Sequence, residues 1–247
     1  MKNNYIKLTS EFVDNFLSPL ANVIDRAPFY IDDGKITVSC FNSTGDVEFG
    51  LSFWMDIDTD ISDTTINLSD LKKFKNLINR ATEINQNDKL VLDKNVLKYK
   101  STKWRWKYYL LDAGLLNTRK IKKESLDKFN SNVSFVIKPD SLVDIVKIKA
   151  LHKNNSDKVY LKIEDDKITA CITDLTASNT DEIGVSVTDK FETDNEIDQV
   201  IIKFDLIKIL SQHRGVSFKV KISKTACLFQ TVWNGVNIAY ISSQLRK

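Results

Sequence analysis

The sequence predicts an α+β protein made of two related halves, each with antiparallel strands and two helices. The first observation is a repeat: Ile31-Asp32-Asp33-Gly34-Lys35-Ile36-Thr37 returns in the second half as Ile163-Glu164-Asp165-Asp166-Lys167-Ile168-Thr169. Self-similarity of this kind indicates a duplicated structural unit. The second observation is that β-rich runs flank both copies, which is typical of hairpin strands. The third is that a polar residue precedes an apolar periodic segment twice in each half, which predicts two capped helices per half.

In the first half we expect two helices among short strands. Ser10 and Asp70 precede the two periodic segments and are the expected N-caps. Pro19 lies inside the first segment and is expected to break or kink that helix. The strands are expected at 5–8, in a hairpin over 29–42, and at 47–54, 65–68, 89–94, 96–100 and 105–111.

The second half repeats the same order of elements. Asp140 and Asp205 precede its two periodic segments and are the expected N-caps. The strands are expected at 133–137, in a hairpin over 159–175, and at 183–187, 200–204, 217–223, 225–231 and 236–242. A polar, basic stretch with few leucines lies between the halves. We therefore predict an N-terminal domain over 1–112, a connector over 113–131 and a C-terminal domain over 132–247.

Composition bounds the kinds of function that the chain can have. Its 247 residues are 42% hydrophobic and 28% charged, which is enough apolar material for one large or two small cores and excludes global disorder. The formal charge of +3 gives no whole-molecule attraction to polyanions, so the placement of the charges must decide any nucleic-acid binding. No stretch approaches the roughly 18 apolar residues of a membrane span, and we expect a cytoplasmic protein.

The residues that usually carry chemistry are scarce. Three cysteines lie far apart and there are two histidines, which argues against a disulfide framework, a zinc cluster and a histidine triad. Only 7 glycines occur, and no phosphate-binding or nucleophile-elbow motif is present. The acidic segment 56–60 begins like a calcium loop, but Ile61 stands where the turn glycine belongs. We expect no enzyme activity, no metal and no cofactor.

The whole chain resembles the sliding clamps of DNA replication, in particular those of T-even-type bacteriophages, which are similar in fold to proliferating cell nuclear antigen. The duplicated order of elements, the hairpin motif of residues 32–37 and the run Lys98–Asp112 carry this resemblance. It implies two clamp-type domains, each an antiparallel sheet with two helices on one face. It also implies a homotrimeric ring whose helices surround double-stranded DNA without reading its sequence. The partners implied are DNA polymerase and a clamp loader, in the cytoplasm of an infected host cell.

Cations on the solvent-facing sides of the predicted helices are the candidates to face DNA phosphates. In the second helix the apolar positions fall on one side, leaving Lys72, Lys73 and Arg80 opposite and Lys75 at the margin. The alternative is the solvated face of an ordinary surface helix. The polar side of the first helix is acidic. In the second half the candidates are Lys147, Lys149 and Lys153, on a helix of undecided orientation, with Lys208 and Arg214. Arg214 is alternatively a partner of the helix dipole.

Residues 103–109 alternate between cations and aromatic residues, so a strand here would place the two kinds on opposite faces. The aromatic face would either stack the bases of a single strand or pack as core against a helix. The clamp resemblance places this strand at the joint between subunits. There Lys103, Arg105 and Lys107 would face Asp181 and Glu182 of a neighbour, unless the charges merely protect an edge strand from aggregation.

The clamp resemblance also implies an apolar pocket for a peptide of the polymerase, beside the connector. The candidate residues are Val47, Leu115, Leu116, Leu126, Ile241 and Leu245. Alternatively, the leucines only hold the connector against the domains. Two other functions stay open at this level. One is a single-stranded nucleic-acid-binding protein that uses Trp104 and Trp106, and the other is a phage structural protein built from duplicated sheets.

Overall fold

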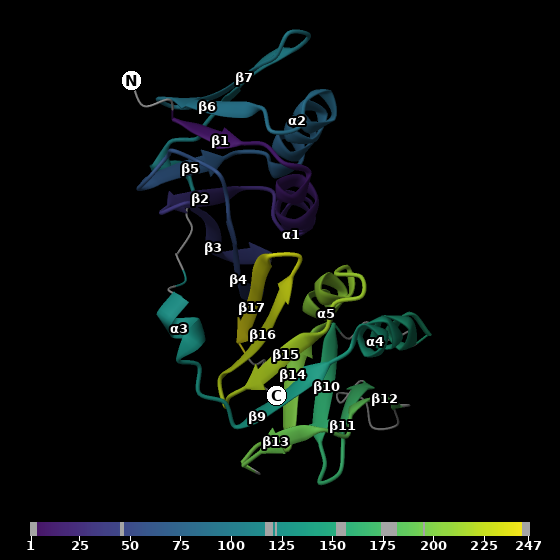
Figure 1. The fold of residues 1–247 in the computed structure, drawn as a ribbon. Coiled ribbons are helices and arrows are strands. Elements are labelled where there is room, and N and C mark those ends of the chain that lie inside the picture. The colour runs from purple at the N-terminus through teal and green to yellow at the C-terminus, as the bar shows by residue number, and fades with distance from the viewer. Residues whose placement is uncertain are drawn as a thin grey trace. The chain divides into compact units, whose positions relative to one another are not determined.

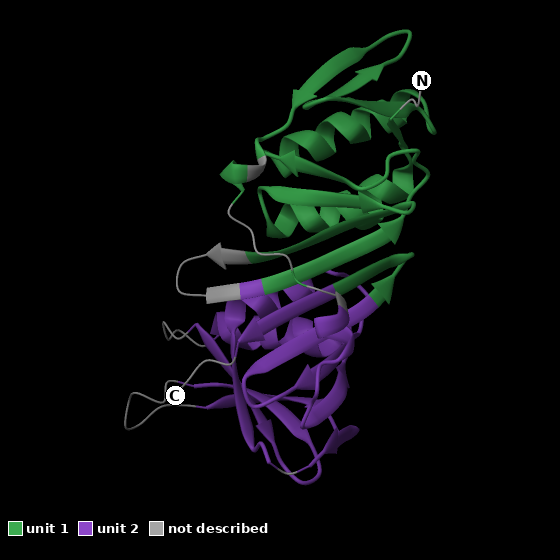
Figure 2. Cartoon of the chain, turned by 90° about the vertical axis from the view of Figure 1, so that its left-hand side faces the viewer, with its two compact units in different colours: residues 1–42, 50–121, 232–238 green, residues 43–49, 122–231, 239–247 purple. Residues whose placement is uncertain are grey.

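The computed structural model describes residues 4–44, 47–116, 121, 123–151, 157–173, 182–194 and 196–243. It divides into two compact units (Figure 2). Unit 1 contains residues 1–42, 50–121 and 232–238, and unit 2 contains residues 43–49, 122–231 and 239–247. In both units, some strands that lie side by side in a sheet are not consecutive in the chain.

Unit 1 contains two antiparallel groups of strands. The first has the order β1-β6-β7-β8 and the second the order β4-β3-β2-β5. The bounds are β1 Tyr5–Lys7, β2 Ala27–Asp32, β3 Lys35–Thr44, β4 Val47–Asp56, β5 Thr64–Leu68, β6 Lys89–Asp93, β7 Val96–Lys100 and β8 Arg105–Tyr109. The turn between β2 and β3 uses Asp33 and Gly34 with φ of 45° and 68°. Two successive positive φ values are characteristic of the tight turn that best joins twisted strands, which explains the acidic-glycine motif of the repeat.

The helices of unit 1 lie together on one side of these strands (Figure 1). A π-helical segment, η1 Phe12–Leu17, continues into α1 Ser18–Val23, and α2 spans Leu71–Ile84. Phe16 packs edge-on against Phe29 and Phe53, and Phe29 packs edge-on against Phe74 of α2. The core of unit 1 therefore lies between the apolar faces of the helices and the strands.

Two details of the first helix correct the sequence-based expectations. Ser10 already lies inside the helical segment, and the preceding Thr9 caps it, because Thr9 Oγ1 accepts a hydrogen bond of 3.1 Å from the backbone N–H of Phe12. Pro19 does not break the helix. It lies in the first turn of α1, directly after the π-helical segment. Proline has no N–H to donate, so the change of helical hydrogen bonding at this point accommodates it.

Unit 2 has the same kinds of elements. Its strands follow the orders β13-β9-β15-β16-β17 and β12-β11-β10-β14. The bounds are β9 Val133–Ile137, β10 Lys158–Ile163, β11 Ile168–Ile172, β12 Ile183–Thr188, β13 Phe191–Thr193, β14 Gln199–Lys203, β15 Phe218–Ile222, β16 Ala226–Trp233 and β17 Val236–Ser243. Helices α4 Pro139–Leu151 and α5 Phe204–Ser211 contact each other on one side of these strands (Figure 1). The connector contains a short 3-10 turn, η2 Ala113–Leu115, and the helix α3 Lys123–Asp127.

The expected caps of α4 and α5 are each wrong by two positions. Asp140 is the second residue of α4, and Asp205 is the second residue of α5, which follows Lys203. Both acidic residues lie in the first helical turn, where a negative charge is favoured by the helix dipole, but neither occupies the cap position. The predicted α+β class is confirmed. None of the helices in the described part of the chain is long and apolar enough to cross a membrane.

Candidate nucleic-acid interface

Helix α2 presents one apolar and one basic face, as the sequence predicts. Asp70 caps it, accepting a 2.8 Å hydrogen bond from the backbone N–H of Lys73. On the inner face Leu71, Phe74 and Ile78 are buried. The periodicity that buries these residues leaves the intervening cations in solvent.

Tyr108 of β8 fixes the start of this helix. Its hydroxyl donates to the carbonyl oxygen of Asp70 at 3.1 Å and accepts from the backbone N–H of Asp70 at 2.9 Å. The same hydroxyl lies 3.1 Å from Ser69 Oγ. The Tyr108 ring packs edge-on against Phe74, with ring centroids 5.3 Å apart. The sheet therefore holds the first turn of α2, and with it the lysines of that turn, in a fixed orientation.

The four predicted cations of α2 differ in solvent exposure and in ion pairing. Lys72, Lys73 and Arg80 are exposed, whereas Lys75 is half-buried. Lys72 Nζ lies 3.3 Å from a carboxylate oxygen of Asp25, and Arg80 donates to Glu83 at 2.7 Å. All these side chains are largely in water, so the two ion pairs are weak and a phosphate can compete for the cations.

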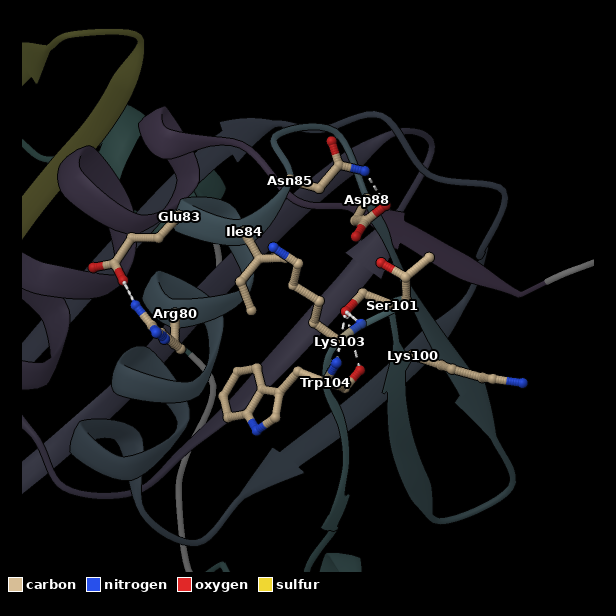
Figure 3. A pocket seen from close by; sticks show the side chains of 10 residues that line it. Arg80, Glu83, Ile84, Asn85, Asp88, Lys100, Ser101, Lys103 and Trp104 are labelled. Atoms are coloured by element: carbon tan, nitrogen blue, oxygen red, sulfur yellow. Dashed lines mark hydrogen bonds and ion pairs between the residues drawn. The ribbon is translucent and has the colours of Figure 1, made fainter.

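A groove follows the exposed side of α2 in two sections that share Arg80 and Trp104. One section, of about 810 Å³, has Lys72 and Lys73 in its wall. The other, of about 1060 Å³, lies between the end of α2 and residues 100–104 (Figure 3). In that view Lys103 extends toward Ile84, and Lys100 points away from the other side chains. Cations outnumber carboxylates in both sections, which also contain Asp25 and Asp70 in one and Glu83 and Asp88 in the other.

The predicted DNA-facing cations of unit 2 lie on α4 and α5 or follow them in the chain. Leu142 and Ile145 are the buried residues of α4, which settles the orientation that the sequence left open. Lys147 is exposed and paired with Asp144 at 3.0 Å, and Lys149 is half-buried. On α5, Lys208 is exposed. Arg214 is exposed beyond the end of the helix, and Lys153 lies outside the described residues.

Strand β8 separates its aromatic and cationic residues as predicted. Trp106 and Tyr108 face α2, while Arg105 and Lys107 are exposed on the other side. Trp106 stacks on Tyr99 with ring centroids 5.7 Å apart, and Trp104 packs edge-on against both rings. These rings are already in contact with one another and with the core. The contacts of Trp106 match the interpretation as core packing, whereas the half-buried Trp104 also lines both sections of the groove.

Strands β8 and β12 each end a four-stranded order, β1-β6-β7-β8 in unit 1 and β12-β11-β10-β14 in unit 2. Glu182, beside β12, accepts hydrogen bonds of 2.7 and 2.8 Å from Lys162. These hydrogen bonds lower the pKa of Glu182 and raise that of Lys162. Asp181 lies outside the described residues. Of the two predicted acidic partners of the β8 cations, Glu182 therefore already has a lysine partner within its own unit.

The predicted peptide-pocket residues have contrasting environments. Leu115 is 65% exposed, whereas Leu126 of α3 is buried and Leu116 and Ile241 are half-buried. The side chain of Val47 and the whole of Leu245 lie outside the described residues. An exposed leucine beside the connector is available to a partner without unfolding the chain, whereas the buried Leu126 contributes to packing.

The remaining titratable groups have structural roles. His213 Nε2 lies 2.8 Å from the Tyr240 hydroxyl, and burial lowers the pKa of His213 to about 4. Burial also raises the pKa of Cys40 and Cys227 to about 12. In the segment 56–60, Asp60 accepts a 2.6 Å hydrogen bond from the backbone of Tyr5. Within the described residues, no group of three or more potential ligands could hold a metal ion.

The solvent-facing side of β6, β7 and β8 forms a further basic surface, here called the basic sheet face, of which the sequence pattern predicted only the β8 cations. It consists of Lys89, Lys98, Lys100, Arg105 and Lys107. The alternation of lysines in Val96–Lys100 and of cations in Arg105–Tyr109 is visible in the sequence. The pairing register, which places both sets on one face, is a property of the fold.

Comparisons with solved structures define the class of fold. Proliferating cell nuclear antigen from Entamoeba histolytica matches with a TM-score of 0.71 and 13% identity over all of both chains. The A. fulgidus protein bound to the C-terminal region of FEN-1 matches with a TM-score of 0.72 and 13% identity over 99% of each chain. The Helicobacter pylori beta clamp bound to a DNA ligase peptide matches with a TM-score of 0.66 and 11% identity, over 100% of this chain and 67% of that one.

The chain therefore has the α+β fold of the DNA sliding clamps over its whole length. The sequence matches no protein-family model. A search of curated proteins also finds no match. At 11–13% identity the likeness shows a shared fold, and the function must be argued from the surfaces described above.

Proposed function

We propose that this protein is a sliding clamp that encircles double-stranded DNA and tethers a DNA polymerase, without chemistry of its own. The observation that carries the proposal is the clamp fold over the full chain together with the basic exposed face of α2. Sliding requires phosphate contacts that do not read bases, and lysine and arginine side chains on a helical face supply them. The resemblance to clamps of T-even-type bacteriophages further supports a homotrimer, a phage origin and a separate clamp loader.

In this proposal the DNA contacts come from Lys72, Lys73 and Arg80 on α2 and Lys208 on α5, with Lys75, Lys147, Lys149, Lys153 and Arg214 in lesser roles. The first four are the best candidates because three lie on one exposed face of α2 and Lys208 is exposed on α5. Glu11 and Asp14 are also exposed, so the beginning of the first helix contributes no attraction to phosphate.

The ring would close by pairing β8 of one subunit with β12 of the next. β8 belongs to the predicted N-terminal domain 1–112, and β12 belongs to the predicted C-terminal domain 132–247. Both strands end their sheet orders and expose a backbone edge within the described residues. Edge strands are ready to add another strand, and a head-to-tail contact of this kind closes into a ring when its rotation permits. Lys103, Arg105 and Lys107 would then lie near Asp181 and Glu182, with Glu182 shared between Lys162 and the neighbour.

A partner peptide would bind beside the connector. Two clamps of the same fold were solved with peptides, one with the C-terminal region of FEN-1 and one with a DNA ligase peptide. Peptide grooves derive most of their affinity from a few apolar anchors. The exposed Leu115 gives the cleanest test: Leu115→Ser should weaken binding of a polymerase-tail peptide, whereas the equally exposed Leu151→Ser on α4 should not. Equal affinities for both variants would remove Leu115 from the pocket.

Topological retention on DNA tests the main proposal. Dissociated subunits are concentrated in the presence of double-stranded DNA blocked at both ends, and the complex is then washed with high salt. A clamp remains on blocked DNA and leaves once a restriction enzyme opens it. Light scattering should give a mass near three times the 28.3 kDa of one chain. Protein that leaves blocked and cut DNA at the same rate would contradict the proposal.

A variant with Lys72, Lys73, Arg80 and Lys208 changed to alanine should load less and keep the ring mass. Its binding should lose about one unit of salt slope for each phosphate contact removed. The matched control changes four exposed lysines outside α2 and α5, Lys128, Lys167, Lys190 and Lys219, to alanine. Equal loss in both variants would indicate a general charge effect rather than a DNA-facing surface.

Charge reversal tests the joint. Arg105→Glu with Lys107→Glu should shift the particle toward monomer, and Asp181→Lys with Glu182→Lys in the same chain should restore it partly. The individual ion pairs are weak, about 0 to 1 kcal/mol, so the effect should be measured at low protein concentration. An oligomer that stays intact there and at high salt would show that the ring uses another interface.

A further inference from the structure

On the basic sheet face, like charges stand directly opposite each other at alternate positions of neighbouring strands. Lys98 is opposite Lys107, and Lys100 is opposite Arg105. On the adjoining pair of strands Lys7 is opposite Lys89. Like charges in directly opposed positions destabilise a sheet, so the fold by itself gains nothing from this arrangement.

Few acidic groups compensate these cations. Asp93 pairs with Lys98, and Asp58 pairs with Lys7. The ammonium of Lys89 lies 3.8 Å from the centre of the Tyr5 ring instead of beside a carboxylate. Lys100, Arg105 and Lys107 have no ion pair among the described residues. The pKa of Asp93 is held below its ordinary value mainly by its hydrogen bond to Lys98, with Lys94 and Lys107 contributing.

The chemistry of the face favours an extended polyanion as its occupant. Its exposed large hydrophobic side chains are Val91 and Tyr109, too few to anchor an amphipathic peptide or to enter a lipid layer. Tyr109, however, is 70% exposed and stands two residues from Lys107 on the same side of β8. Cations that follow a backbone, beside an aromatic ring on which a base can stack, are the combination that single-stranded nucleic acid requires.

We propose that the basic sheet face binds single-stranded nucleic acid through its phosphates, with Tyr109 stacking on a base. Most of the site is separate from α2, because Trp106 and Tyr108 lie on the opposite side of the same sheet and face the helix. Of its cations, Lys100 also borders the groove at the end of α2. The site therefore differs from the contact with duplex DNA proposed above. Arg105 and Lys107 also belong to the proposed joint, so the cations of β6 and β7 are the ones that test this site independently of ring closure. It also differs from the expectation for Trp104 and Trp106, since those rings are packed in the unit.

The test is fluorescence anisotropy with a labelled oligothymidylate of about 20 nucleotides, titrated at several salt concentrations. The variant carries Lys89→Gln, Lys98→Gln and Lys100→Gln, which lie on β6 and β7 and leave the edge strand β8 unchanged. It should bind about tenfold more weakly, and its salt slope should fall by about 2 units, since single strands contribute about 0.7 per phosphate contact. Tyr109→Ala should weaken binding of the oligothymidylate and leave binding of an abasic strand of the same length unchanged.

The control variant has the same loss of charge on the helices, Lys72→Gln, Lys73→Gln and Lys208→Gln, and should keep the oligothymidylate affinity of the parent. The reverse result, with binding lost only in the helix variant, would overturn the proposal. Equal affinity and salt slope for the parent and the sheet variant would do the same.

Two further probes separate other occupants. Tighter binding to a polyglutamate peptide or to phosphatidylserine vesicles than to the oligonucleotide, lost in the sheet variant, would assign the face to a protein or a membrane. Light scattering of each variant separates this test from ring formation, because the sheet face should bind oligonucleotide even where no ring forms.

Discussion

The two sheets that end in edge strands differ in how far their cations are neutralised. In unit 2 Lys162 of β10 is paired with Glu182, and Lys203, which stands opposite Lys158, is paired with Asp157. On β6, β7 and β8 of unit 1, Lys100 and Arg105 stand opposite each other and have no such partner among the described residues. A sheet surface that serves only to remain soluble is expected to mix its charges. The difference singles out the unit 1 surface as the one with opposed cations that lack an ion pair in the part of the chain that the structure describes, which is the observation behind the proposed binding of single-stranded nucleic acid.

The largest expected effect is a loss of stability at acidic pH, which we expect in unit 2. Burial lowers the pKa of His213 from 6.5 to about 4, so the folded state stays neutral while the unfolded state takes up a proton. The free energy of unfolding of unit 2 should therefore fall by about 3 kcal/mol as the pH falls from about 6.5 to about 4, and level off below that. Hydrogen exchange resolved by residue should show unit 2 opening first. His213→Gln should flatten this dependence, and an unchanged pH profile would contradict the assignment.

The next effect compares the two sides of β8. Tyr108→Phe removes the hydroxyl that holds Ser69 and Asp70 at the start of α2. Loss of these hydrogen bonds should cost about 1 to 2 kcal/mol of unfolding free energy, measured in urea. It should also raise amide exchange in the first turn of α2. Arg105→Gln, on the other side of the same strand, is the matched control and should leave that turn protected.

A smaller loss of unfolding free energy is expected when the ion pair between Lys162 and Glu182 of unit 2 is removed. Glu182→Gln leaves Lys162 without its carboxylate and should lower the free energy of unfolding by about 0.5 kcal/mol. The loss should be greatest at neutral pH. It should disappear as the pH falls through the lowered pKa of Glu182, because the parent carboxylate is then protonated as well. A variant that is as stable as the parent at pH 7 and low salt would show that this pair contributes nothing.

The smallest effect should have the opposite sign. Lys100→Gln removes one of two like charges that face each other and should raise the free energy of unfolding by about 0.2 to 1 kcal/mol at low salt. Screening should abolish the gain near 1 M salt. A variant that is more stable and yet binds oligonucleotide more weakly would be the signature of a surface kept for binding. A destabilised variant would mean that Lys100 supports the fold.

The sequence by itself determined much of this architecture. The repeated hairpin motif and the alternating runs located the strands to within a few residues, because period-two burial and turn chemistry are local properties. The helical faces of α2 and its cap at Asp70 followed in the same way. The expected caps Ser10, Asp140 and Asp205 were displaced, since a cap depends on where the chain leaves the preceding strand, which local patterns do not specify.

Only the tertiary structure decided which surfaces are available. Strand register placed Lys98 opposite Lys107, although each lysine is unremarkable in its own strand. Packing turned Trp104 and Trp106 toward Tyr99, and it buried Leu142 and Ile145 of a helix whose apolar residues point in several directions. The physical reason is that sequence patterns report which side of an element is apolar. The neighbours across a sheet or helix contact are set by pairings between residues that are distant in the chain.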